Sequence, residues 1–439
     1  MKSKYIDTIV DKKPDSWCHV CEKESISFGR SQLLHVVTVA DAISRISDSF
    51  SPRRHTESRP LLDSLGLISA GDLHSPEMLP AFDRSTVDGF AVRAQDTFGA
   101  AAAQPSYCTL VGQVAMGEAA AMEIGPGQTV AIATGGCLPQ GADAVVMIED
   151  TTELPDGSIE IARSVAPGEN LIHAGEDVAH GAPVLAAGER VRPQDIGLCA
   201  ALGITEIEVQ MPLRLGILST GIEIVPADSA SVPCGKIRDV NAYAVAGLAQ
   251  VAGIETELLG LVGDNVDAIY DKVAAGLERN DVVVLSGGSS VGTRDHTEEV
   301  LSRLGGFELL FHGISVKPGK PTLAACNGQK LVVGLPGHPA SALVAFDAVV
   351  LPALDVQLRS RITCTARLSA NISSSPGREE YVRVKLRDDV ELDWAEPVHG
   401  KSGLISTITR SDGYVRIPLE SNGIEQGSMV EVIRYRGCI

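Results

Sequence analysis

A regular alternation of apolar strands and helices between residues 212 and 358 constrains the fold more than any other feature of the sequence. Strands are predicted at LRLGILS, ETELLGLVG and DVVVLSGG, with helices at DVNAYAVAGLAQVAG and DNVDAIYDKVAAGLERN between them. Strands that are apolar on both faces are buried on both faces, which is typical of a mostly parallel sheet covered by helices. We therefore predict a doubly wound α/β domain over residues 212–358.

The rest of the chain indicates several further regions, because 439 residues exceed one ordinary domain. Short apolar runs broken by Gly, Pro and Asp predict a β-rich module over residues 80–150. A similar pattern over residues 362–439 predicts a C-terminal β-barrel, with a small sandwich as the alternative. Residues 34–79 and 151–211 are assigned to a linker and dimerisation region, and residues 1–33 to an N-terminal extension. The predicted fold class is thus α/β plus β, in several domains.

One helix is expected within the first linker segment, over VTVADAISRISDSF. Apolar residues recur there at helical spacing, and Thr38 and Asp41 stand where a capping box would begin the helix.

The composition of the chain argues against nucleic acid and membranes as partners. The chain has 37 Lys plus Arg against 56 Asp plus Glu, a formal net charge of -19, which would repel a nucleic-acid backbone. No apolar run reaches the roughly 18 residues of a membrane span, and the N-terminus lacks the apolar core of a signal peptide, so we expect a cytoplasmic protein. Nine cysteines in so long a chain favour reduced thiols. Cys18 and Cys21 could form half of a zinc site, but no second half follows at ligand spacing.

Glycine-rich turns follow the strands of the predicted α/β domain. They read STGIEI at 219–224, VGDN at 262–265, SGGSSVGTRD at 286–295, KPGKP at 317–321 and LPGHPAS at 335–341. In open parallel sheets such turns gather at one edge, where ligands bind. Their backbone N–H groups, with Lys317 and Lys320, favour an anionic ligand.

Three carboxylates, those of Glu223, Asp264 and Asp295, are expected at the same edge and indicate Mg²⁺. Each feature alone is also typical of an ordinary turn, a helix cap or a solvated lysine. Their occurrence together on one edge favours a site for phosphate and metal.

The order of eight motifs resembles that of the molybdopterin molybdenumtransferases of the bacterial MoeA type, which are similar to the E domain of gephyrin. The motifs are LPAFDRSTVDGFAV at 79–92, AIATGGCLPQGADAVVMIED at 131–150, APGENLIHAGEDV at 166–178, STGIE at 219–223, SGGSSVGTRD, VKPGKP, LPGHPAS, and PGR at 376–378. The resemblance implies the last step of molybdenum cofactor synthesis. In that step molybdate, or tungstate, is inserted into adenylylated molybdopterin with Mg²⁺-dependent release of AMP. It also implies a homodimer whose active cleft is completed by the second subunit.

The resemblance further implies a set of site residues. Asp83 and Asp88 lie in the D-x-S-x-x-D-G stretch. Catalytic roles are expected for Glu223, Asp88, Thr134, Asp177, Lys317 and Lys320, and metal binding for Glu223, Asp264 and Asp295. Substrate binding is expected for Ser219, Thr220, Gly221, Ser286, Gly287, Gly288, Asp295, Pro336, Pro339, Ser341, Arg378 and Ser402, of which the last two belong to the predicted barrel.

Two positions depart from the pattern. Ile222 replaces an acidic or amide residue, and His338 replaces an asparagine that is common in the LPG-x-P turn. Two alternative functions stay open at this stage. The first is a molybdopterin adenylyltransferase, whose similar α/β domain usually stands alone. The second is a scaffold protein with reduced catalysis, like the receptor-clustering E domain of gephyrin, which retention of Glu223, Asp264, Asp295 and both lysines disfavours.

Overall fold

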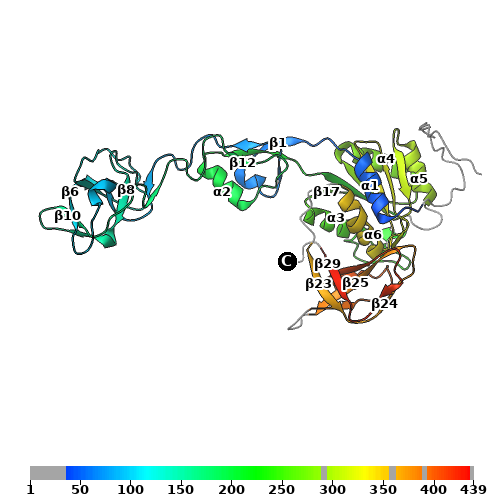
Figure 1. The fold of residues 1–439 in the computed structure, drawn as a ribbon. Coiled ribbons are helices and arrows are strands. Elements are labelled where there is room, and N and C mark those ends of the chain that lie inside the picture. Colours follow the sequence, from blue (N-terminus) through cyan, green and yellow to red (C-terminus); the bar gives the residue numbers. More distant parts are fainter. Residues whose placement is uncertain (1–35, 288–293, 355–361, 388–392, 436–439) are drawn as a thin grey trace, which may run out of the picture. The chain divides into compact units, whose positions relative to one another are not determined.

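The chain forms two compact units in a computed structural model that describes residues 36–287, 294–354, 362–387 and 393–435 (Figure 1). The larger unit combines the segment up to residue 51 with the chain from residue 214 onward, and the smaller unit consists of residues 52–213. Within the described residues, no helix has the length and apolar character that crossing a membrane requires.

The larger unit contains a six-stranded sheet in the order β17-β14-β18-β22-β21-β19. The first four strands are parallel: β17 (Glu255–Val262), β14 (Arg214–Thr220), β18 (Val282–Gly287) and β22 (Leu331–Leu335). The last two, β21 (Leu323–Cys326) and β19 (Glu308–His312), run antiparallel to their neighbours. A tight turn at Asn327–Lys330 joins β21 to β22, and so short a connection can join only antiparallel strands.

Helices pack on this sheet as the alternating sequence predicts. The apolar residues of α4 (Val266–Arg279) and α5 (Arg294–Arg303) share one core cluster with alternate residues of β18 and with β22. Helix α3 (Asn241–Val251) packs against α6 (Pro339–Ala345), which continues through a π-helical turn, η4 (Phe346–Val350), into α7 (Leu351–Ala353). The prediction of a doubly wound α/β domain is confirmed.

The C-terminal part of the larger unit is a closed barrel. Strands β25 (Glu379–Arg387), β26 (Trp394–Pro397), β23 (Thr363–Leu368), β29 (Met429–Arg434) and β27 (Gly413–Ile417) pair in that order, and β27 pairs back with β25. Apolar side chains of all five strands fill its interior. The short strand β20 (Val316–Lys317) extends from the α/β region and pairs with β25, which joins the barrel to that region. The barrel prediction is confirmed, and the sandwich alternative is not.

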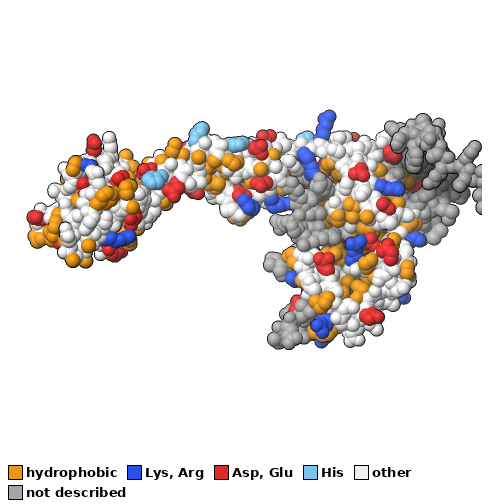
Figure 2. Space-filling model, viewed as in Figure 1, with side chains coloured by type: hydrophobic (Ala, Val, Ile, Leu, Met, Phe, Trp, Pro, Cys, Tyr) orange, Lys and Arg blue, Asp and Glu red, His pale blue; other side chains and the backbone are white. Residues whose placement is uncertain are grey.

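The smaller unit is rich in short strands. Its largest sheet has the order β8-β5-β7-β6-β10-β9: β8 (Ala144–Met147), β5 (Gly89–Val92), β7 (Gln128–Ile132), β6 (Ser106–Gln113), β10 (Ser158–Ile161) and β9 (Thr151–Glu153). A separate three-stranded sheet pairs β1 (Thr56–Pro60), β13 (Glu206–Gln210) and β2 (Ile68–Ser69). Figure 2 shows hydrophobic side chains on the surface of this unit, where Leu62, Phe98 and Met116 are all more than half exposed.

Strands β9 and β10 and helix α1 pack with other regions than those to which their residues were assigned from the sequence. Strands β9 and β10 belong to the six-stranded sheet, because β10 pairs along β6, so that sheet continues beyond residue 150. Helix α1 (Val39–Ser49), expected in the linker region, packs against η4 and α7 of the larger unit. Its start is as predicted, since the Thr38 hydroxyl accepts a hydrogen bond from the Asp41 N–H at 3.1 Å.

Candidate functional site

The carboxyl ends of three neighbouring strands bring the first predicted turns together. Thr220, at the end of β14, lies opposite Val262 of β17 on one side and opposite Gly287 of β18 on the other. The Gly221 N–H donates to the Val262 carbonyl at 3.1 Å, which extends the pairing into the turn. The parallel register therefore places the carboxyl ends of β17, β14 and β18 side by side, as the sequence predicts.

The ends of β14 and β18 lie so close together that residue 287 must be a glycine. Its φ is +121°, and a Cβ built on it would lie 1.9 Å from the Thr220 carbonyl oxygen. Because that oxygen belongs to a buried strand, it cannot move aside, and a larger residue would force β14 and β18 apart. The first glycine of the SGG turn, Gly287, is thus explained by strand spacing at the site.

The predicted metal ligands are only partly described. Glu223 is exposed, and its carboxylate folds back over Gly221, whose added Cβ would lie 2.8 Å from both carboxylate oxygens. Asp264 is half-buried in the turn after β17. Asp295 belongs to the first turn of α5, but its side chain, like all of Gly288, lies outside the described residues. Among the described side chains, no group of three His, Cys, Asp or Glu residues is placed to hold a metal, so the three-carboxylate site stays a prediction.

A buried polar network, which sequence reasoning missed, holds the hydroxyls at this edge. The Ser219 hydroxyl donates to Asp239 at 2.7 Å, and Asp239 also accepts from the Ala242 N–H at the start of α3. The Asn241 amide donates to the Ser286 hydroxyl at 2.8 Å and to the Gly337 carbonyl at 2.9 Å. One short segment, Asp239–Asn241, therefore ties together the ends of β14 and β18 and the turn after β22. A polar pair just ahead of an apolar helix was the signal that could have indicated it.

A pocket of about 640 Å³ lies where the α/β region meets the barrel. Five predicted residues line it: Lys317, Lys320, Ser341, Arg378 and Ser402. Pro336 is buried and Pro339 begins α6, which carries Ser341 to the pocket wall. The structure thus brings residues from chain positions 317 to 402 to one cavity, whose charged side chains are mostly basic.

The pocket also has lining residues that were not predicted, among them Glu380, Arg383 and Lys401. Lys317 and Glu380 are register partners in the β20–β25 pair, and their side chains form an ion pair at 2.6 Å. The second carboxylate oxygen of Glu380 accepts from the Ser374 hydroxyl at 3.0 Å. Lys320, by contrast, is exposed at the pocket wall.

His338, which stands where an asparagine is common in the LPG-x-P turn, lies beside this pocket. The ring Nδ1 of His338 lies 3.0 Å from the Ser402 hydroxyl, and the Ala340 N–H donates to the Ser402 carbonyl at 3.1 Å. The imidazole therefore contacts a pocket residue directly and links the LPGHPAS turn to the barrel.

The remaining predicted residues lie in the smaller unit. Asp88 accepts from the Thr134 N–H at 2.7 Å and from the Thr134 hydroxyl at 2.9 Å, and these hydrogen bonds lower the pKa of the Asp88 carboxyl. The pKa of Asp83 is lowered by the Ala174 N–H and by His173, whose ring lies 3.2 Å away.

Backbone pairing explains this grouping. The backbones of Asp83 and Ser85 form hydrogen bonds with the backbone of residues 135–138. Asp177 is exposed, and its backbone N–H donates to the Leu79 carbonyl. Three predicted motifs of the smaller unit therefore lie next to one another.

Comparison with known proteins identifies the family. The MoeA N-terminal region (domains I and II) matches residues 37–203, the probable molybdopterin binding domain matches 216–356, and the MoeA C-terminal region (domain IV) matches 365–435. The molybdopterin molybdenumtransferase of Bacillus subtilis is 31% identical over 91% of this chain and 94% of its own. That of Haemophilus influenzae is 30% identical over 90% and 98%. The crystal structure of a molybdopterin biosynthesis MoeA protein from Pyrococcus horikoshii matches with a TM-score of 0.80 at 34% identity, over 92% of this chain and all of that one.

The chain belongs to the molybdopterin molybdenumtransferase (MoeA) family.

Membership of the MoeA family supports a role in molybdenum cofactor biosynthesis and a molybdopterin substrate. It also bears on the alternative of a lone adenylyltransferase domain. Such a domain corresponds to the central region alone, whereas this chain also carries the N-terminal and C-terminal MoeA regions. The cationic pocket lies between the central and C-terminal regions, so it depends on a part that a lone domain lacks.

Proposed function

We propose that this chain inserts molybdate into adenylylated molybdopterin and releases AMP. The observation that carries the proposal is the pocket between the α/β region and the barrel, which Lys317, Lys320 and Arg378 line together with three serines. Ammonium, guanidinium and hydroxyl groups donate hydrogen bonds to a tetrahedral oxyanion, and fixed positive charge favours a dianion over neutral ligands. The pocket therefore has the chemistry that molybdate, or tungstate, needs.

The edge formed by the β14 and β18 turns is assigned to the pyrophosphate of the substrate. Ser219 and Ser286 are buried, and their hydroxyls are held by Asp239 and Asn241, so the ends of β14 and β18 are fixed before a ligand binds. Ordered donors stabilise developing negative charge without reorganisation during the reaction, which is the usual advantage of such a site. Because the Ser219 hydroxyl proton is already donated to Asp239, the backbone N–H groups beyond these strand ends would bind and orient the phosphoryl group that is attacked.

The residues at this edge also fit Mg²⁺. Glu223 presents an exposed carboxylate beside Gly221, and Asp264 follows the adjacent strand, so both supply the hard oxygen ligands that Mg²⁺ prefers. Asp295 follows the third strand and would complete the set. When bound, Mg²⁺ would neutralise phosphate charge and polarise the P–O bond that is cleaved.

We further propose that the chain acts as a homodimer whose active cleft includes the smaller unit of the second subunit. The surface of the smaller unit exposes several large apolar side chains, as an interface requires. The carboxylates of Asp83, Asp88 and Asp177, with the Thr134 hydroxyl, would face the substrate or its metal.

The decisive experiment incubates the purified chain with adenylylated molybdopterin, molybdate and Mg²⁺. We expect AMP release together with active cofactor, measured by reconstitution of a cofactor-free molybdoenzyme. Formation of the adenylate from ATP and molybdopterin would instead support the adenylyltransferase alternative. Binding without any turnover would support a scaffold. Repeating the assay with limiting molybdate or tungstate determines which anion is preferred.

A further inference from the structure

A buried carboxylate lies in the apolar helix that begins with α6. Asp347 is 5% exposed, and it is the one charged residue between Pro339 and Ala353. It belongs to the π-helical turn η4, whose other residues are all buried and apolar. Placing a carboxylate in such surroundings is unfavourable unless it accepts hydrogen bonds, and π-helical turns are rare and frequent at functional sites. The position of Asp347 therefore calls for an explanation beyond helix packing.

The hydrogen-bond donor to this carboxylate comes from the barrel. The Tyr414 hydroxyl, on β27, donates to Oδ2 of Asp347 at 2.5 Å, and Tyr414 is only 1% exposed. The Tyr414 ring packs against two others, with centroid distances of 5.3 Å to Tyr381 and 5.9 Å to Tyr435. Because aromatic packing at these distances restrains the ring, the direction of the Tyr414 hydroxyl is set by the barrel.

The two residues connect opposite walls of the pocket between the α/β region and the barrel. The helical wall includes Ser341 on α6, and the barrel wall includes Tyr381 on β25. Asp347 follows Ser341 in the same continuous run of helix, and Tyr414 contacts Tyr381 directly. The hydrogen bond between Asp347 and Tyr414 therefore joins the element that carries one wall to the element that carries the other.

This buried pair is explained better by geometry than by stability. Replacing a buried polar pair with apolar residues of similar shape often leaves the stability of a protein unchanged or increases it. An apolar contact tolerates small shifts between the two surfaces, whereas a hydrogen bond has a preferred length and direction. The pair thus favours one spacing of the helical wall and the barrel wall over others.

We propose that Asp347 and Tyr414 are positioning residues that fix the spacing of these two walls and so determine how tightly the adenylylated substrate is bound. Neither is among the described residues that line the pocket, so both act through the residues of the walls. The inference rests on the proposed function, and neither the sequence motifs nor the comparisons assign a role to this pair. The Ala340 N–H, which donates to the Ser402 carbonyl at 3.1 Å between the same two walls, reports on their spacing.

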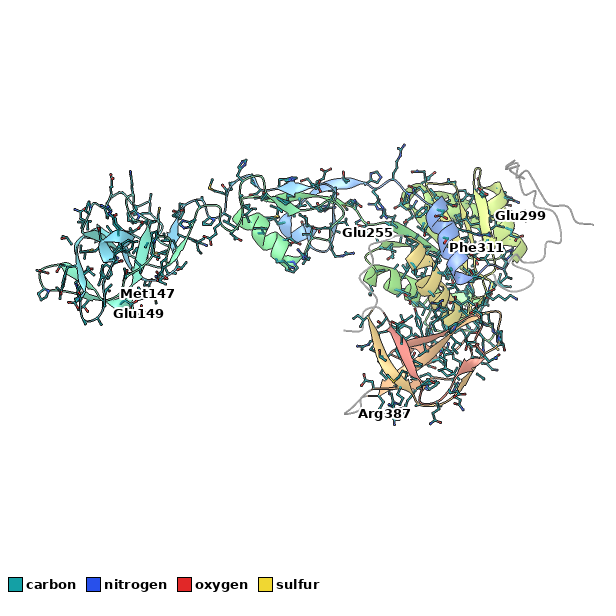
Figure 3. All side chains as sticks on the ribbon, in the orientation of Figure 1. Met147, Glu149, Glu255, Glu299, Phe311 and Arg387 are labelled. Atoms are coloured by element: carbon teal, nitrogen blue, oxygen red, sulfur yellow. The ribbon has the colours of Figure 1, made fainter. Side chains whose placement is uncertain are left out.

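The test combines steady-state kinetics of AMP release with hydrogen exchange of the Ala340 amide, both on the full chain. Tyr414→Phe removes the hydrogen bond and keeps the ring. KM for the adenylylated substrate should rise about 10-fold with kcat nearly unchanged, and the Ala340 amide should exchange faster. The matched control is Tyr435→Phe, whose hydroxyl lies 3.3 Å from that of Ser411 in the C-terminal region. A second control is Arg387→Gln, where the barrel side chain is 70% exposed (Figure 3). Both controls should behave as the unchanged chain does.

A double variant separates positioning from stability. Asp347→Leu combined with Tyr414→Phe replaces the polar pair with apolar side chains, and Leu has the same branching as Asp. Its free energy of unfolding should equal or exceed that of the unchanged chain, yet KM should still be raised about 10-fold. Asp347→Asn retains an oxygen that accepts from Tyr414, so its KM should stay close to the unchanged value. If Tyr414→Phe alone does not fold, the double variant carries the test.

An unchanged KM in a folded double variant would overturn the inference, whether or not the Ala340 amide exchanges faster, and would leave the proposed function intact. If the unchanged chain releases no AMP, the proposed function fails, and amide exchange alone then decides about the pair. Faster exchange in the double variant would still show that Asp347 and Tyr414 hold the two walls together. Unchanged exchange would overturn that as well.

Discussion

At the scale of single residues, Glu223 is the group whose replacement separates binding from chemistry. Its carboxylate is exposed beside Gly221, at the edge where the substrate pyrophosphate is expected. Glu223→Gln keeps the size of the side chain but removes the charge that a metal ion needs. We expect substrate binding to persist and kcat to fall by roughly 10²-fold or more, as when charge stabilisation in the transition state is lost.

Steady-state kinetics of AMP release measure this effect, with Asp228→Asn, beyond the short strand β15 (Ile224–Val225), as the control. Asp228 is exposed and has no predicted role, so its replacement should leave kcat unchanged. A Glu223→Gln variant with weak binding but an unchanged maximal rate would show that Glu223 positions the substrate, and the metal would then belong to Asp264 and Asp295.

Thr134 sets the ionisation of Asp88 through two hydrogen bonds, of which the backbone bond has the larger effect. Thr134→Val removes the hydroxyl bond and keeps the backbone bond. The pKa of Asp88 should therefore rise but stay below its ordinary value of 3.8. Carboxyl NMR titration measures it, and Thr152→Val, at an exposed position of β9, serves as the control.

The sign of the accompanying stability effect follows from the direction of the shift. Because the folded chain binds the Asp88 proton less tightly than the unfolded chain does, both bonds stabilise the fold above the unfolded pKa. That contribution disappears as pH falls through the lowered, folded pKa. Thr134→Val should thus reduce stability at neutral pH more than at pH values below both pKa values. An equal reduction at both would show that the lost stability has another source.

Among the elements, the residues at the start of α3 hold the ends of β14 and β18 and the turn after β22 together. Asn241 is 9% exposed, its side-chain amide N–H groups donate to Ser286 and Gly337, and its side-chain Oδ1 has no partner among the described residues. Asn241→Ala should lower the free energy of unfolding by about 1–3 kcal/mol, because it leaves buried polar groups unpaired. It should also raise KM more than it lowers kcat, since it loosens the turns that bind substrate.

Chemical denaturation and AMP-release kinetics measure the two effects. Gln250→Ala is the matched control on the same helix, because its side chain is exposed and bonds Thr256 at 2.8 Å. If Asn241→Ala lowers stability but leaves KM unchanged, these hydrogen bonds are structural only.

The elements also show what sequence patterns can predict. Apolar strands alternating with helices were sufficient for the α/β domain, because burial on both faces leaves few other arrangements. Helix α2 (Pro193–Ala201) was missed: it is only nine residues long, contains Gly197 and has small apolar residues, so its helical period is weak. The antiparallel strands β21 and β19 were not distinguished from parallel ones, because a strand's own sequence carries little information on the direction of its neighbour.

The same limit applies to the pocket. Lys317, Lys320 and Arg378 were predicted from motifs, but Arg383 stands in EEYVRVKLR, where alternating charges are typical of a solvent-facing strand surface. The structure buries Arg383 because the strand also lines a cavity against the α/β region. The sequence of the strand alone cannot predict this cavity, because part of its wall comes from residues more than sixty positions earlier in the chain, such as Lys317.

At the scale of the whole molecule, the proposed active site needs residues from both units. Asp88 belongs to the smaller unit and Glu223 to the larger one. If the two come from different subunits of a dimer, mixing inactive Asp88→Asn and Glu223→Gln chains should restore activity. In a mixed dimer one site carries both replacements, while the other has both native residues. With equal amounts and free exchange, half of the dimers are mixed, so about a quarter of all sites should be intact.

Two affinity tags, one on each variant, establish that subunits exchange, and AMP release by the doubly purified dimer measures the restored activity. The control mixes Asp88→Asn with Asp83→Asn, both in the smaller unit. Neither site of that dimer can be intact if the two residues serve one site together, so no activity should return. Exchange without restored activity in the first mixture would show that Asp88 and Glu223 of the same subunit act together. The cleft would then be complete within one chain, and dimerisation would have to serve another purpose than catalysis.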